Sequence, residues 1–296
     1  MKKLIVFLMA CLVMTWGCAS VVYVSQESGK NQLMKSKDNS PLQPQALFAT
    51  AYDDSMPDVS HDGKWVAFKR VVGGFDRIIV RQTHDAVGAT EKDLTQGTRP
   101  RWAPAGDWIL FRDQGKICRI KPDGTMRTQI TNPAATVTDN FGHDFWNAST
   151  IVFARGTGTA IGTGQTVGLY LQDLNTAVVT GPVLASCYAP VVSHNGLLMG
   201  CELKFATGPA IIHYINTYEI PALRAVNRIS FTYGPNNPSI SNAANFAFSS
   251  DDSKYFFSAI PPGGTKREIY SIGFGGAGLT PLTNNGWNDD YPEGYK

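Results

Sequence analysis

The sequence repeats itself with a period of about 45 residues, which is the range of repeat architectures. Five segments share an apolar run, a turn rich in Asp, Asn and Gly, and a second apolar run. They begin at Pro57, Pro100, His143, Pro190 and Phe246. Their starts lie 43, 43, 47 and 56 residues apart, and Pro292 opens a further copy that stops at once. A repeat of this kind decides the fold before any other feature does.

Each repeat predicts four strands. The two apolar runs and the turn between them form a β-hairpin, because Asp, Asn and Gly adopt tight-turn conformations cheaply. A third apolar run follows in each copy, at residues 78–80, 117–120, 169–171, 211–215 and 269–272. A fourth closes each copy, at residues 94–95, 130–131, near 183, at 229–230 and 282–283. Four strands in such a repeat specify one blade of a β-propeller.

The fold class is therefore all-β, a propeller of four-stranded antiparallel blades. Five complete repeats predict five blades. The alternative is six blades, with one split between the chain ends and assembled from residues 21–24, 46–48 and 291–295. A split blade would close the ring and hide its strand edges.

Three motifs resemble the repeats of TolB-type β-propellers. They are Pro57-Asp58-Val59-Ser60-His61-Asp62-Gly63-Lys64-Trp65-Val66-Ala67-Phe68, the Pro122-Asp123-Gly124 turn before Ile130-Thr131, and Leu282-Thr283 followed by Asn288-Asp289-Asp290 and Pro292. The resemblance covers residues 46–296. It implies the fold but no single function, because this propeller serves many unrelated roles.

The N-terminus predicts export. Lys2 and Lys3 precede an apolar run over residues 4–14, which is too short for a membrane span of about 20 residues and is typical of a secretory signal. Gly17-Cys18 resembles the cleavage box of bacterial lipoproteins, which implies a signal peptide over residues 1–17 and lipidation of Cys18. The alternatives are cleavage to a soluble protein and an uncleaved anchor. Residues 18–44 are expected to form a lipid-attached flexible tether, and residues 45–296 the propeller.

This leader locates the protein in the bacterial cell envelope. Ala19 stands where enteric lipoproteins retained at the inner membrane have aspartate, which favours the outer membrane, facing the periplasm. Soluble periplasmic and surface-exposed locations are the alternatives. The 26 basic and 24 acidic residues give a net charge of +2, which argues against nucleic acid as a partner. We expect a monomeric propeller.

Three cysteines remain after the leader and the lipidated residue: Cys118, Cys187 and Cys201. The turn of the fourth hairpin is centred between His194 and Asn195, so Cys187 and Cys201 face each other across two strands. An oxidising compartment would allow a disulfide between them. The alternative is a pair of buried thiols.

Motifs that carry catalytic chemistry are missing. The sequence has no Gly-x-Ser-x-Gly, His-Glu-x-x-His, Cys-x-x-Cys or phosphate-binding Gly-x-x-x-x-Gly-Lys pattern. Its Asp-Gly turns each offer one or two carboxylates, whereas calcium takes about 6 to 8 oxygen ligands. We therefore predict no cofactor, with a cation such as calcium in the channel as the alternative.

The loops before the innermost strands should converge on one mouth of the propeller channel. Polar groups that converge on a concave mouth predict a binding site. The residues placed there are Asp53, Asp54, Arg99, Asp139, His143, Asp144, Tyr188, Asn237, Asp289 and Asp290. The alternative is that these loops are polar only because they are exposed to solvent.

The sequence thus predicts a non-enzymatic envelope lipoprotein that binds a protein or peptide partner at this mouth. The alternative is a glycan-active hydrolase or lyase that uses paired carboxylates there. Its candidate catalytic residues are Asp53, Asp54, Asp139, His143 and Asp289. A third possibility is a structural element whose blade edge, instead of its mouth, forms the interface.

Overall fold

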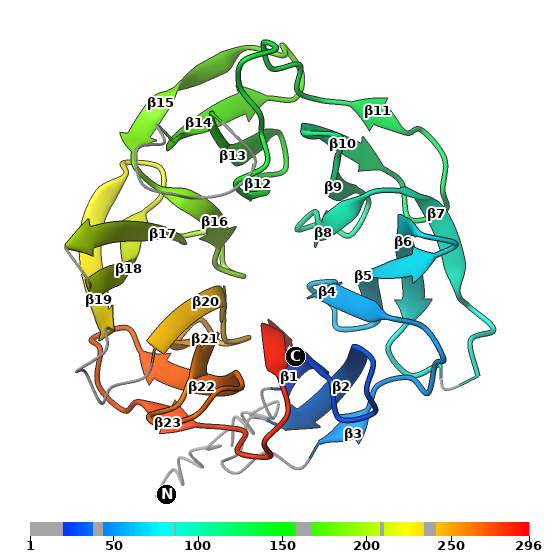
Figure 1. The fold of residues 1–296 in the computed structure, drawn as a ribbon. Helices are drawn as coiled ribbons and strands as arrows, with labels where there is room; N and C mark the ends of the chain where they lie inside the picture. Colours follow the sequence, from blue (N-terminus) through cyan, green and yellow to red (C-terminus); the bar gives the residue numbers. More distant parts are fainter. Residues whose placement is uncertain are drawn as a thin grey trace, which may run out of the picture.

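The chain folds into six four-stranded antiparallel sheets arranged around a central channel (Figure 1). This computed structural model describes residues 20–37, 44–85, 87–157, 167–207, 210–233 and 241–295. Within each sheet the strands follow one another outwards from the channel. The arrangement is a β-propeller, as the repeat predicts.

Five blades are continuous in sequence. They are β4 (Asp54–Val59), β5 (Trp65–Val72), β6 (Phe75–Gln82) and β7 (Lys92–Gln96); β8 (Thr98–Trp102), β9 (Ile109–Asp113), β10 (Lys116–Ile120) and β11 (Thr128–Gln129); β12 (His143–Asn147), β13 (Thr150–Gly156), β14 (Val167–Asp173) and β15 (Val179–Ala185); β16 (Tyr188–Val192), β17 (Leu198–Thr207), β18 (Ala210–Glu219) and β19 (Arg224–Tyr233); and β20 (Ser241–Phe248), β21 (Lys254–Ile260), β22 (Glu268–Gly273) and β23 (Thr280–Pro281).

The sixth blade joins the two ends of the described chain. Its innermost strand is β24 (Asp289–Tyr295), and outside it lie β1 (Ser20–Ser25), β2 (Gln32–Lys37) and β3 (Gln45–Ala46). The expectation of five blades is therefore wrong, and the split blade is the correct alternative. The reason is that β24 pairs with β1, which leaves no open edge in the ring.

The closing blade also corrects the predicted tether. Residues 20–25 and 32–37 are strands of the propeller, and Val21, Val22 and Tyr23 are fully buried. The polar sequence after residue 25 concealed this, because it forms the β1–β2 turn and the outer part of the blade. The propeller thus begins at Ser20. The predicted signal peptide and Cys18 lie outside the described residues.

Recurrent side-chain contacts shape the turn between the first two strands of a blade. Ser60 Oγ donates to Asp62 Oδ1 at 2.7 Å, the Lys64 amide donates to the same oxygen, and Gly63 has a φ of 72°. Ser193 with Asn195, and Ser249 with Asp251, repeat the hydroxyl-to-oxygen contact in two other blades. These contacts fix the hairpins locally, which explains why the repeat is visible in the sequence.

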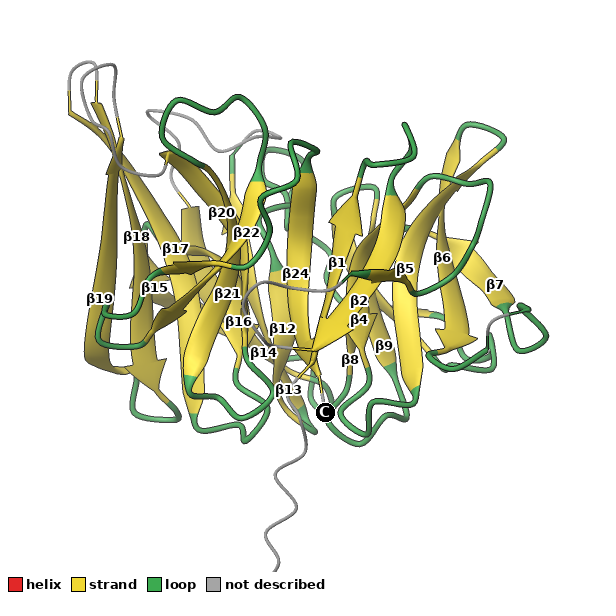
Figure 2. Ribbon diagram, turned by 90° about the horizontal axis from the view of Figure 1, so that it is seen from below, coloured by secondary structure: helices red, strands yellow, loops and turns green. Residues whose placement is uncertain are grey.

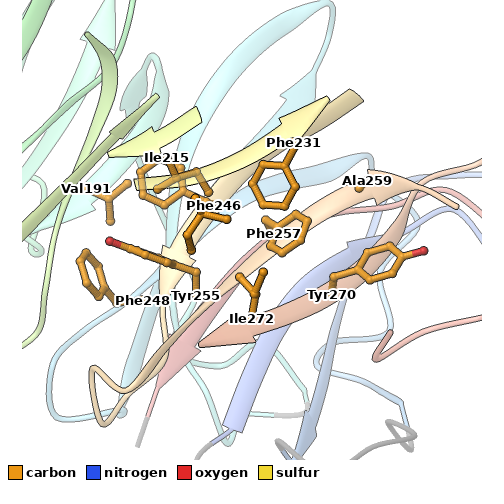
Figure 3. Packing of buried hydrophobic residues seen from close by; sticks show 11 residues of the cluster. Val191, Ile215, Phe231, Phe246, Phe248, Tyr255, Phe257, Ala259, Tyr270 and Ile272 are labelled. Atoms are coloured by element: carbon orange, nitrogen blue, oxygen red, sulfur yellow. The ribbon is translucent and has the colours of Figure 1, made fainter. Parts of the chain in front are cut away.

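The hydrophobic core lies between neighbouring blades. Phe246, Tyr255 and Phe257 of β20–β21 pack against Ile215 and Phe231 of the preceding blade (Figure 3). The other side chains of this cluster are Val191, Ile229, Phe248, Ala259, Tyr270 and Ile272. Comparable clusters fill the other blade interfaces, so blades are stabilised mainly by their neighbours.

Cys187 and Cys201 are joined by a disulfide, with their Cα atoms 5.8 Å apart. Cys187 directly precedes β16 and Cys201 lies on β17, so the bridge joins the two sides of the fourth hairpin, as the sequence argument expects. Cys118 is a buried free thiol. None of the described segments forms a helix long and apolar enough to cross a membrane.

All six innermost strands run in the same direction along the channel (Figure 2). The loops that precede them therefore lie on one face, which we call the entry face. The turns that join innermost to second strands lie on the opposite face, which we call the hairpin face. Ser20 pairs with Tyr295 at the end of β24, so β1 begins at the hairpin face.

Candidate functional site at the central channel

One residue of unusual backbone conformation occurs at the same repeat position in all six blades. These residues precede the repeat starts and all have positive φ: Met56 (53°), Arg99 (54°), Gly142 (115°), Ala189 (47°), Asn245 (48°) and Tyr291 (51°). In several blades the pairing with the second strand shifts here, as between Ser55 and Asp58. Such bulges redirect the side chains near them, and they are frequent beside functional sites.

These six residues line a small cavity in the channel, of about 50 Å³. His143, Glu202 and the prolines that follow the bulges complete its wall. Arg101 and Glu293 lie at its inner end. The ring is tight: a Cβ added to Gly142 would lie 2.6 Å from the Cα of Ala189, and the Ala189 amide donates to the Phe141 carbonyl.

A layer of charged side chains crosses the channel on the hairpin-face side of this cavity. Its residues lie two positions after the bulge residue of their innermost strand. Four blades contribute Asp58, Arg101, Asp144 and Glu293. Arg101 Nη1 lies 2.6 Å from Asp58 Oδ1 and 3.2 Å from Glu293 Oε2. Despite burial, these negative charges raise the pKa of Arg101, so the guanidinium stays protonated. Arg101 therefore holds three neighbouring blades together.

Two carboxyl groups of this layer, Glu293 and Asp144, have raised pKa values. Burial raises the pKa of Glu293 to about 8, and the nearby charge of Asp58 adds to the effect. Burial likewise raises the pKa of Asp144 to about 6, against the opposing charge of Arg101. Glu293 thus carries a proton at neutral pH, and the layer avoids two uncompensated buried anions.

Two carboxylates of the layer also connect successive innermost strands. Asp58 Oδ2 accepts the amide of Trp102 at 2.6 Å, and Asp144 Oδ2 accepts the amide of Val192 at 2.8 Å. In both cases the donor lies in the next blade along the chain. These side chains therefore set the spacing of the ring as well as its charge.

The cavity wall on the entry face is cationic and contains a neutral histidine. Burial lowers the pKa of His143 to about 3, and the charges of Arg101, Arg112 and Arg99 contribute. His143 is 3% exposed, and neither ring nitrogen bonds to a side chain. Burial and the charge of Arg99 also lower the pKa of Arg112, whose Nη1 donates to the Asn140 carbonyl.

No protein-family model matches the chain, and no curated protein matches its sequence. Solved structures do match. TolB from Acinetobacter baumannii aligns with a TM-score of 0.67 at 13% identity, and the match covers 93% of this chain and 66% of that TolB. The fold is that of a TolB-like β-propeller. At this identity the likeness shows the fold alone.

Other solved structures are also similar to the chain. The nidogen/laminin complex contains a chain with a TM-score of 0.60 at 7% identity, with 94% of this chain and 98% of that chain covered. An oligogalacturonate lyase from Vibrio parahaemolyticus gives 0.50 at 9% identity, with 90% and 84% covered. Proteins described in such different terms share this architecture, so function must be argued from the site.

In this TolB-like propeller, several predicted mouth carboxylates are bound to arginines of their own blade. Asp54 accepts two hydrogen bonds from Arg70, at 2.7 and 2.9 Å. Asp139 accepts two from Arg155, at 2.7 and 3.1 Å. Asp54 begins β4 and its partner Arg70 lies on β5, whereas Asp139 lies in the segment before β12 and its partner Arg155 lies on β13. These carboxylates are therefore held in ion pairs within their own blades.

The remaining candidate carboxylates each have hydrogen-bond partners of their own. Asp289 is fully buried, its pKa is raised to about 6 chiefly by burial, and Asn285 donates to it. Asp290 accepts from Asn245 and from the Ser258 hydroxyl. Asp53 is exposed and accepts the Asn31 amide.

Three of the predicted residues meet at the channel, and one falls outside the structure. Arg99 and His143 line the cavity, and Asp144 belongs to the charged layer. Tyr188 is buried within the core between blades. Asn237 lies outside the described residues.

The sequence argument missed Asp58, Arg101, Glu293 and Arg112. The first three share one position with Asp144, the residue directly after each repeat start. An alignment of the repeats would have shown that the residue at this position is charged in four consecutive blades. Arg112 lies on a second strand, and no pattern in the sequence points to the channel from there.

Within the described residues, no three His, Cys, Asp or Glu side chains are arranged to hold a metal ion. The channel carboxylates surround the Arg101 guanidinium, which supplies the positive charge among them.

Proposed function

We propose that this protein is a non-enzymatic component of the bacterial envelope, and that it binds a protein or peptide partner at the entry-face mouth of its channel. The observation that supports this most is the cavity ringed by the six bulges. It is lined near the starts of the innermost strands and is backed by the Arg101 layer. A pocket of this form suits the capture of a segment from another molecule.

The arrangement of carboxylates favours binding over glycan cleavage. Hydrolysis by a carboxylate pair needs two groups on either side of one bond. Asp54 and Asp139 are each bound to an arginine, and Asp289 is buried with Asn285 against it. A binding function needs no such pair.

Anchoring at Cys18 would orient the propeller. One residue, Ala19, separates Cys18 from Ser20, and Ser20 lies at the hairpin face beside Tyr295. A lipid on Cys18 would therefore hold the hairpin face next to the membrane. The entry-face mouth would point away from it, towards a periplasmic partner.

The test is crosslinking in cells that express the C-terminally tagged full-length protein, followed by membrane fractionation, capture and mass spectrometry. We expect a specific envelope protein to be captured, and to be lost in Arg99→Gln. Arg224→Gln, on an exposed outer strand, is the matched control and should retain the partner. Capture that is equal in both variants would disprove the mouth as the binding site.

The anchor has a separate control. Cys18→Ser should move the protein from the membrane to the soluble fraction. If the wild-type protein is itself soluble, or if Cys18→Ser stays in the membrane fraction, lipidation of Cys18 is wrong, whatever the partner result shows.

A further inference from the structure

The entry-face mouth carries two arginines, Arg99 and Arg112, that form no ion pair with a side chain of the described residues. Arg99 has no carboxylate within ion-pair distance in that part of the chain, and its buried Nε atom has no hydrogen-bond acceptor. Arg112 is likewise without an ion pair there, and its one bond is to a backbone carbonyl. Other arginines of the entry face are matched: Arg70 by Asp54, and Arg155 by Asp139. Buried guanidinium donors without acceptors are costly and favour an anionic ligand.

His143 complements this charge with a neutral donor. Its side chain lines the same cavity as Arg99, and it is uncharged at neutral pH because its pKa lies near 3. A neutral imidazole has one N–H donor and one acceptor nitrogen, and the Arg99 backbone is already a hydrogen-bond partner of this ring. Of the two carboxyl groups that line the cavity, Glu202 is bound to His213 at 3.0 Å and Glu293 lies against Arg101. Arg99 therefore keeps guanidinium donors for an anion.

The size of the cavity limits what can enter. Its volume is only about 50 Å³, so a small polar group such as a carboxylate suits it. The group that enters must belong to a chain that continues outside the cavity.

A larger groove of about 660 Å³ lies between blades β4–β7 and β8–β11. Arg112 lines it together with Gln96, Thr98 and Asn140. Its carboxylates, Asp76 and Asp113, are paired with Lys69 and Arg127. Phe75 lines its outer part and is 60% exposed. Peptide backbone groups and one apolar side chain would both find partners along such a path.

We propose that the mouth recognises the carboxylate of an extended peptide. The carboxylate sits against Arg99 and His143, the chain passes Arg112, and an apolar residue packs on Phe75. The carboxylate comes from a C-terminus or from an Asp or Glu side chain. This inference rests on the proposed function and adds the chemistry of the ligand to it.

The test uses three pools of random hexapeptides labelled at the N-terminus with an uncharged, carboxylate-free BODIPY dye, with fluorescence polarisation as the measurement. One pool has a free C-terminus and no Asp or Glu. The second is the same pool amidated. The third is amidated and carries one Asp at a random position. Binding of the first pool identifies a C-terminal carboxylate, and binding of the third identifies a side-chain carboxylate.

We expect the amidated, carboxylate-free pool to bind at least about 10-fold more weakly than a carboxylate-bearing pool, since a charge-assisted hydrogen bond contributes a factor of about 10 to 100. Arg99→Gln should remove this preference, and Arg112→Gln should reduce it. Arg224→Gln, whose guanidinium binds Glu219 on the exposed outer strands, should leave it intact. Unchanged thermal midpoints confirm that the variants are folded.

Equal binding of all three pools overturns the proposal, and so does a preference that survives Arg99→Gln. Binding of trigalacturonate in competition with the peptides would replace the peptide with a glycan. If no pool binds but a partner still crosslinks at the mouth in cells, the carboxylate proposal fails and the proposed function stands. If neither occurs, both fail.

Discussion

His194 Nε2 hydrogen-bonds to the carbonyl of Gly294 at 3.0 Å, across one hundred residues of sequence. The Nδ1 atom of the same ring lies 3.1 Å from Asp252 Oδ1. The two contacts join a hairpin turn of the β16–β19 blade to the next blade and to the closing strand β24. One imidazole therefore helps to close the ring where the chain ends meet.

Gly294→Ala should destabilise the closed ring. A Cβ at this position would collide with the carbonyl oxygen of Phe248 and lie 2.8 Å from the Cα of Ser249. Overpacking against backbone costs about 1–3 kcal/mol. Urea unfolding followed by circular dichroism measures the loss. Gly275→Ala is the control, because no atom lies within 4 Å of its added Cβ. Equal stability of the two variants would show that β24 is not tightly held.

Arg101→Met should lower the free energy of unfolding by about 3–5 kcal/mol, because it leaves the Asp58 carboxylate buried without its cation. Arg224→Met, which breaks the exposed pair with Glu219, should cost less than about 1 kcal/mol. Chemical denaturation of both proteins gives the comparison. A loss in Arg101→Met no larger than in the control would mean that the channel layer does not support the ring.

Stability should fall as the pH rises from 6.5 to 8. The raised pKa of Glu293, about 8, means that the folded state keeps a proton that the unfolded state has already lost. The pKa of His194 is also raised: burial opposes the shift, but the hydrogen bond to Asp252 and the charge of Glu293 outweigh it. Both groups therefore stabilise at low pH and lose that contribution as the pH passes their folded pKa values.

The slope for one proton is at most about 1.4 kcal/mol per pH unit. Glu293→Gln should flatten the pH dependence of the thermal midpoint in this window, because the amide does not titrate. Glu219→Gln, at an exposed site, is the matched control. A wild-type midpoint that rises between pH 6.5 and 8 would contradict the raised pKa of Glu293.

The Cys187–Cys201 disulfide should contribute about 3 kcal/mol, the value expected for a loop of about 15 residues. The double variant Cys187→Ser, Cys201→Ser tests this by urea unfolding, with the wild-type protein under reducing conditions as the second arm. The two should show similar midpoints, below that of the oxidised wild type. If reduction leaves the wild-type midpoint unchanged, the bridge does not constrain the chain.

Val22→Asp should prevent folding or cost several kcal/mol, because it places a carboxylate at a fully buried position of β1. Ser28→Asp, in the exposed β1–β2 turn, should have little effect. Thermal unfolding of both proteins distinguishes a strand from a tether: if both variants are as stable as wild type, residues 20–25 do not belong to the propeller.

The sequence predicted where the channel mouth lies, but not the net sign of the charge there. The repeat placed Arg99 and His143 at a channel mouth, because loops at equivalent points of a propeller converge. The sequence also suggested a mouth rich in carboxylates. The structure shows that Asp54 and Asp139 are paired with arginines on adjacent strands, which leaves Arg99 as the unmatched charge. Pairing of side chains across strands depends on register, and bulges shift the register here.

The sequence alone determined the blade, because hairpin turns such as Ser60–Gly63 and the strand periodicity are local and act within a few residues. It also determined which cysteines could meet, since both lie in one hairpin. Only the tertiary structure decided how many blades close the ring, where β1 pairs and how Arg101 neutralises the channel. These features join residues up to 275 positions apart, such as Ser20 and Tyr295, and no local pattern encodes a contact that exists only once the whole ring has closed.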